Sequence, residues 1–103
     1  MNITEEVLLD IGFINKGTID NETRQLYEIY IDGIGFLALI TDIDSDIHYL
    51  YFHKDKDDKN FNIISRVTSL SKLVEAMSQS IKIESIKLGK KLKQEEFKTV
   101  LGI

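Results

Sequence analysis

The chain has 103 residues, 43% of them hydrophobic, and a net charge of −4. This length predicts a single domain over residues 1–103, and the hydrophobic content excludes a disordered chain. The chain contains no cysteine, which excludes disulfides, thiolate metal sites and cysteine nucleophiles and favours a cytoplasmic protein over a secreted one.

The N-terminal residues predict a short helix. Thr4 suits an N-cap, acidic Glu5 and Glu6 follow in the first turn, where the helix dipole favours negative charge, and Gly12 suits the residue after the last turn. A signal peptide would have basic residues at its start instead of these acids. No apolar run approaches the roughly 18 residues that span a bilayer, so the sequence predicts no membrane segment.

Three strands are expected in the next part of the chain. We expect a loop or loose hairpin over residues 15–21 before them, because this stretch is polar and contains a glycine. Asp32 and Gly33 form a strong turn signal between the first two strands. Alternating or continuous apolar residues predict an antiparallel meander whose strands cover residues 24–31, 35–41 and 47–53.

One clear helix is predicted after a polar loop at residues 54–60. Residues 61–65 form either a brief strand or the approach to this helix. Apolar residues then recur at spacings of three and four, which predicts a helix over residues 69–78 that ends at residues 78–80. The members of this apolar stripe are Val67, Leu70, Leu73, Val74 and Met77.

The C-terminal segment gives mixed signals. Ile81 and Ile83 alternate as in a strand, Gly89 suits a turn, and residues 94–101 suit a last short helix. We therefore expect a core over about residues 1–80 and an extension over residues 81–103. The fold class predicted for the whole chain is α+β, with an antiparallel meander of three to four strands and helices packed on one face.

Two stretches resemble a known group of proteins. Residues 3–13 (ITEEVLLDIGF) and residues 67–77 (VTSLSKLVEAM) resemble the first and last helices of small uncharacterised proteins from Bacteroidetes genomes and their prophages. The resemblance covers about the first 80 residues and implies the order helix, sheet, helix. It implies no activity. The histidine and aromatic residues that the group carries between its leucines are absent here.

The acidic turn after the second strand is a candidate binding site. Asp42, Asp44 and Asp46 alternate as in a calcium loop, but Ile47 and His53 stand where that loop has glycine and glutamate. The pattern therefore predicts a strand-connecting turn with no metal, and we keep the three aspartates as candidate binding residues on an acidic surface.

No set of side chains suggests catalysis. His48 and His53 differ by an odd number of positions on one strand, so their side chains are expected on opposite faces and share no metal. No serine stands in a glycine elbow, and the lone Gly-x-Gly at residues 33–35 joins two strands, unlike a phosphate-binding loop. The sequence predicts neither an enzyme nor a cofactor.

Two surfaces are candidates for binding. Tyr49 and Tyr51 share a strand face that Tyr27 or Tyr30 could extend, and tyrosine is favoured at interfaces, although the same rings could fill the core beneath the helices. A basic C-terminal segment contains Lys82, Lys87, Lys90, Lys91, Lys93 and Lys98. No recognition helix or stacking surface accompanies these lysines, so nucleic acid is not the expected partner.

The charge is unevenly distributed along the chain. Residues 1–60 hold 13 acidic and 5 basic residues, whereas residues 61–103 hold 4 acidic and 8 basic ones. Such a chain attracts a charged partner or a second copy of itself. The sequence thus favours a non-enzymatic protein-interaction module, one form of which is a phage- or mobile-element-encoded inhibitor of a host protein. The alternative is a small-ligand-binding domain that acts as a homodimer.

Overall fold

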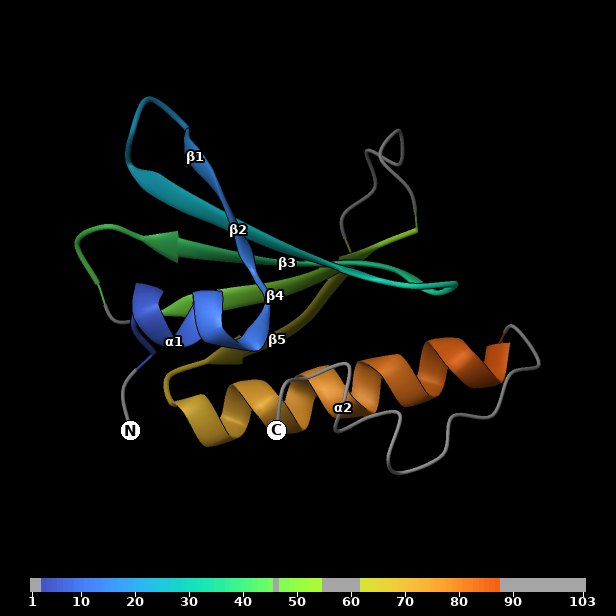
Figure 1. Ribbon diagram of the computed structural model, residues 1–103. Helices are drawn as coiled ribbons and strands as arrows, with labels where there is room; N and C mark the ends of the chain where they lie inside the picture. Colours follow the sequence, from blue (N-terminus) through green and yellow to red (C-terminus); the bar gives the residue numbers. More distant parts are fainter. Residues whose placement is uncertain (1–2, 46, 55–61, 88–103) are drawn as a thin grey trace.

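The structure is a computed structural model that describes residues 3–45, 47–54 and 62–87. These residues form an antiparallel sheet of five strands with two helices on one face (Figure 1). The strands follow one another across the sheet in chain order, from β1 to β5, so each pairs with the next one in a meander. The predicted α+β class is confirmed. The sheet has five strands because two segments whose structure the sequence left open both join it.

Helix α1 covers Glu5–Ile11 and has the predicted ends. The Val7 amide donates a hydrogen bond of 3.3 Å to Oγ1 of Thr4, which confirms Thr4 as the N-cap. The Gly12 amide donates to the carbonyls of Leu8 and Leu9 and so completes the last turn.

Strand β1, Ile14–Ile19, replaces the loop that was one of the two expectations for residues 15–21, and it pairs with β2 as one arm of a hairpin, which was the other. Its pairing with β2 shifts register between Asn15 and Thr18, which places Gly17 in a β-bulge at φ 89°. The strand shows no alternation of buried and exposed residues, because all of its residues before Ile19 are exposed. Only the backbone pairing with β2 identifies it as a strand.

The three predicted central strands are confirmed. We call the side of the sheet that the helices cover the covered face, and it is apolar along its centre. The strands pair in continuous antiparallel register, apart from a bulge between β4 and β5. These strands are β2 (Arg24–Ile31), β3 (Gly35–Asp42) and β4 (His48–His53).

Strand β5, Asn62–Val67, resolves the expected alternative of strand or helix approach at residues 61–65. The assignment of Val67 to the helical stripe is wrong: Val67 pairs with His48 in the sheet and is 1% exposed. Its apolar spacing matched the helix because a strand that ends just before a helix can place a core residue at the same interval.

Helix α2, Leu70–Lys87, corrects the expected end at residues 78–80 and shows that Ile81 and Ile83, whose structure the sequence left open, are helical. The Oγ of Ser69 accepts a hydrogen bond of 3.3 Å from the Lys72 amide at its start. Every fourth residue from Leu73 is buried, and Ile81 is 1% exposed, so the core extends beyond the expected boundary at residue 80. The serines at 78 and 80 interrupt the apolar pattern without breaking the helix. The predicted helix at residues 94–101 and most of the predicted loop at 54–60 lie outside the described residues.

One apolar cluster lies between the covered face and the two helices. It joins Leu8 of α1 to Leu39 and Leu50 of the sheet and to Leu73 and Met77 of α2. α2 packs against β4 and β5, and α1 lies beside β1 on the same side of the sheet (Figure 1). Within the described ranges, neither helix is long and apolar enough to cross a membrane.

Candidate functional site

The predicted tyrosine surface divides between the two faces of the sheet. Tyr30, Tyr49 and Tyr51 lie on the side opposite the helices, here the open face. Tyr27 faces the helices and is 8% exposed. The structure therefore places Tyr30, and not Tyr27, on the same face as Tyr49 and Tyr51.

The open face is apolar although no helix described in the structure covers it. Antiparallel sheets with one solvated face usually carry polar side chains there. Here Ile14, Tyr30 and Ile63 are 62%, 56% and 68% exposed, around a buried centre that contains Ala38 and Ile40. The larger apolar side chains on this face are Ile14, Ile19, Leu26, Tyr30, Phe36, Ile40, Tyr49, Tyr51 and Ile63.

Charged side chains on the open face are mostly paired within the chain. Nε2 of His53 lies 3.0 Å from Oε2 of Glu28, and the His53 ring stacks on Phe36 with centroids 4.8 Å apart. The Tyr30 ring also packs against the Phe36 ring, with the two centroids 5.0 Å apart. Arg24 and Asp42 form a second pair at 3.0 Å. The Asp42 carboxylate is therefore neutralised by Arg24 of the neighbouring strand, and the Glu28 carboxylate has a hydrogen-bonding partner in His53.

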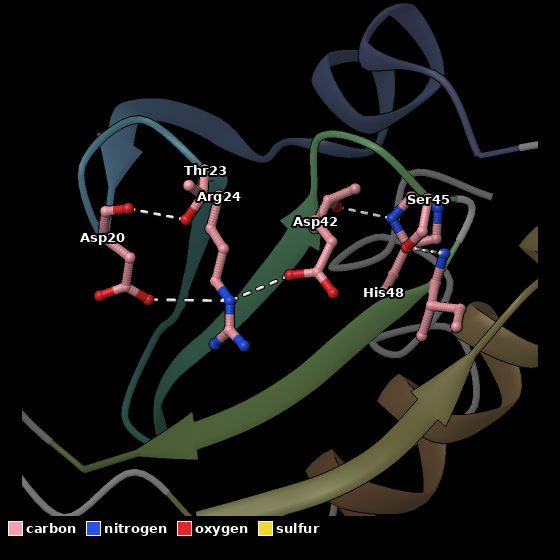
Figure 2. Close-up of polar contacts among 8 residues, drawn as sticks. Asp20, Thr23, Arg24, Asp42, Ser45 and His48 are labelled. Atoms are coloured by element: carbon pink, nitrogen blue, oxygen red, sulfur yellow. Dashed lines mark hydrogen bonds and ion pairs between the residues drawn. The ribbon is translucent and has the colours of Figure 1, made fainter.

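The acidic turn does not gather its aspartates into one site. Figure 2 shows the Arg24 side chain between Asp42 and Asp20, with N–O distances of 3.0 and 3.7 Å. Asp44 is exposed, and Asp46 lies outside the described residues. No group of three residues that could hold a metal occurs in the part of the chain that the structure describes. The Asp42 carboxylate thus pairs strands β2 and β3 at the edge of the open face.

The two histidines lie on opposite faces, as predicted. His48 is on the covered face, where its Nδ1 lies 2.6 Å from Oγ1 of Thr41, and His53 is on the open face. Both side chains are buried, at 8% and 4% exposure.

A pocket of about 250 Å³ that is open to solvent lies between the N-terminal part of α1 and the covered face, and we call it the α1 cavity. Polar residues Gln25, Thr41 and His48 stand side by side on three strands, at positions where a core-facing side chain is usually apolar. Sequence reasoning missed this row, although polar residues at inward positions of neighbouring strands are its signal. The lining residues are Ile3, Thr4, Glu5, Leu8, Gln25, Tyr27, Thr41, Ile43 and His48.

Glu5 and Tyr27 are coupled at the wall of the α1 cavity. The Tyr27 hydroxyl donates a hydrogen bond of 3.3 Å to Oε1 of Glu5. Burial, the negative charge of Glu5 and this hydrogen bond all raise the pKa of Tyr27 above its ordinary value, with burial the largest cause.

The raised pKa of Tyr27 predicts a loss of stability in alkali. The unfolded chain releases this proton near pH 10, before the folded protein does. This stabilisation is therefore fully present below about pH 10 and is lost as the pH rises through the folded-state pKa. Urea unfolding at about pH 8 and about pH 11 should show that Tyr27→Phe reduces this loss.

Glu5→Gln serves as the partial control for this prediction. It removes the charge but leaves Tyr27 buried, so part of the alkaline loss should persist. An equal alkaline loss in wild type and Tyr27→Phe would contradict the assignment.

Comparison of the chain with protein-family models, with curated proteins and with solved structures gives no match. The resemblance to the Bacteroidetes group therefore stays a prediction, and the functional argument depends on the residues of this chain.

Proposed function

We propose that this chain is a non-enzymatic protein-interaction module that binds a partner protein through the open face. The observation that carries the proposal is the exposed apolar surface formed by Ile14, Tyr30, Ile63 and their neighbours on a side that no described helix covers. Large exposed apolar patches on folded domains are typical of interaction sites. Inhibition of a host protein by a phage-encoded chain is one use that such a module would have.

The charges on the open face suit burial against a partner. An unpaired charge is costly to remove from water, whereas Arg24 and Asp42 enter an interface as an ion pair and Glu28 enters it hydrogen-bonded to His53. Tyr30, Tyr49 and Tyr51 add apolar area with a polar hydroxyl, a combination that is enriched at interfaces. Binding by this face should therefore persist at about 0.5 M salt, where charges in water are screened.

The size of the open face is also suitable. Five strands spaced about 4.8 Å apart, with six to eight residues at about 3.3 Å each, cover on the order of 500–600 Å² before side-chain roughness is counted. A standard interface buries about 800 Å² on each partner. The two edge strands are both irregularly paired: the β1–β2 register shifts between Asn15 and Thr18, and the β4–β5 register shifts between Leu50 and Tyr51. Bulges of this kind hinder the addition of a further strand to the edge of a sheet. The face is thus better suited to binding than the edges.

The test compares two double variants in a pull-down read by mass spectrometry. Tyr30→Asp with Ile63→Asp changes two exposed side chains of the open face, at 56% and 68% exposure. Ile83→Asp with Ile86→Asp changes two side chains on α2 that are exposed to a similar degree, at 52% and 65%. The amount of a partner protein that persists after nuclease treatment should fall by about 30-fold or more with the first variant. With the second variant it should equal the amount recovered by wild type.

Retention of the partner by the open-face variant would overturn the proposal. Light scattering on the purified protein separates two kinds of occupant. A monomer that binds a different protein supports the interaction module, whereas a dimer broken by Tyr30→Asp with Ile63→Asp makes a second copy the occupant. The latter result would support the homodimer alternative.

A further inference from the structure

The polar side chains beside the α1 cavity have orientations that the backbone of Gly17 fixes. The Gly17 amide can only donate, and it donates at 2.8 Å to Asn15, so the atom of Asn15 that receives it is Oδ1. Nδ2 of Asn15 therefore lies on the other side of the amide, where it donates at 2.7 Å to Oε1 of Glu5. The bulge in β1 thus determines which way this network is polarised.

The same residue fixes Gln25. The Gly17 carbonyl can only accept, so the atom of Gln25 at 2.9 Å from it is Nε2, which also donates at 2.5 Å to Oδ1 of Asn15. Both donors of the Gln25 amide are used, and its Oε1 has no partner among residues 3–45, 47–54 and 62–87.

Glu5 is left with one unused oxygen in the same way. Its Oε1 accepts from Asn15 and from the hydroxyl of Tyr27, while its Oε2 has no partner within the described ranges. Two residues that line the α1 cavity thus each keep an acceptor with no partner in the described part of the chain, and one of the two, the exposed Glu5, is a carboxylate. Such a pair is complementary to a ligand that carries hydrogen-bond donors and a positive charge.

The other walls limit the rest of the ligand. Ile3, Leu8 and Ile43 provide an apolar surface. The volume of about 250 Å³ is below the range of about 300–1,000 Å³ that is typical of pockets for drug-sized ligands. It equals the liquid volume of roughly eight water molecules. We propose that the α1 cavity binds a small primary ammonium compound with a short aliphatic chain, whose ammonium group is held by Glu5 and Gln25.

A larger groove of about 350 Å³ between α2 and strands β4 and β5 is less suited to this role. It is lined in part by Phe52, Ile64 and Ile83, but its carboxylate, that of Glu84, is already bound to Lys87 at 3.2 Å. The charge in that groove is therefore neutralised within the chain.

The test uses two probes of equal chain length and opposite charge, butylammonium and butyrate, added to isotope-labelled protein. Butylammonium at up to about 50 mM should cause saturable amide shifts at Thr4, Gln25 and Thr41, since weak binding of this order is expected for so small a ligand. Butyrate should cause none of these shifts, because it would place a second carboxylate beside that of Glu5.

Two variants make the assignment specific. Glu5→Gln should weaken butylammonium binding by about tenfold or more, because a neutral amide replaces the charged acceptor. Glu6→Gln removes the same charge one residue later on α1 from a side chain that does not line the cavity, and it should bind like wild type.

Failure of butylammonium to give saturable shifts, or equal shifts in Glu5→Gln, would overturn the proposal. The inference is independent of partner binding at the open face. Tyr30→Asp with Ile63→Asp should keep the butylammonium site, and Glu5→Gln should keep the partner.

Discussion

Gly35→Ala is expected to lower the free energy of unfolding by about 2–4 kcal/mol, measured by urea unfolding. Gly35 has φ 149°, a backbone conformation that residues other than glycine rarely adopt. A Cβ here would lie 2.9 Å from the carbonyl oxygen of His53 and 2.9 Å from Cε2 of Phe52. Strand β4 is held in place by its pairing with β3, so neither neighbour can move away cheaply.

Gly17→Ala is the control for this substitution. Gly17 also has a positive φ, 89°, but a Cβ there would meet no atom within 4 Å. Only the backbone conformation is penalised, so the cost should be about 1–2 kcal/mol. Equal losses in the two variants would mean that contact with β4 contributes nothing at Gly35.

Ile81→Ala is expected to cost about 2–4 kcal/mol of the free energy of unfolding. The Ile81 side chain is 1% exposed and belongs to the apolar cluster beneath the sheet, so its removal leaves a cavity. The substitution keeps the helix, because alanine has the highest helix propensity. Urea unfolding followed by circular dichroism measures the loss.

Ile83→Ala is the matched control. Ile83 lies on the same helix but is 52% exposed, so its truncation should change the free energy of unfolding by no more than about 0.5 kcal/mol. The sequence-based expectation, in which residues after 80 extend beyond the core, predicts small effects at both positions. A small loss for Ile81→Ala would support that expectation and contradict the position of α2.

Local signals in the sequence predicted the elements whose residues interact with near neighbours. The N-cap at Thr4 and the helix end at Gly12 depend on hydrogen bonds that span three or four residues. The turn at Asp32 and Gly33 depends on the conformation of the turn itself. Alternation placed Tyr49 and Tyr51 on one face and the two histidines on opposite faces, because neighbouring side chains of a strand always alternate.

Tertiary pairing determined the elements that the sequence left open or misassigned. β1 has no apolar period of its own and is a strand because β2 offers it a hydrogen-bonding edge. Val67 satisfies both a helical and a strand pattern, and its pairing with His48 decides between them. α2 continues past Ser80 because it packs against β4 and β5 on the covered face, where Ile81 is buried in the apolar cluster.

The candidate sites divide in the same way. The sequence by itself determined that tyrosines share a strand face, since this follows from a period of two. Only the tertiary structure decided that this face lies opposite the helices and that Tyr30 belongs to it, because strand parity does not say which side a helix will cover. Only the structure brought Glu5 and Gln25 together at one cavity, because their contact passes through Asn15 and the bulge at Gly17, and a bulge depends on the partner strand.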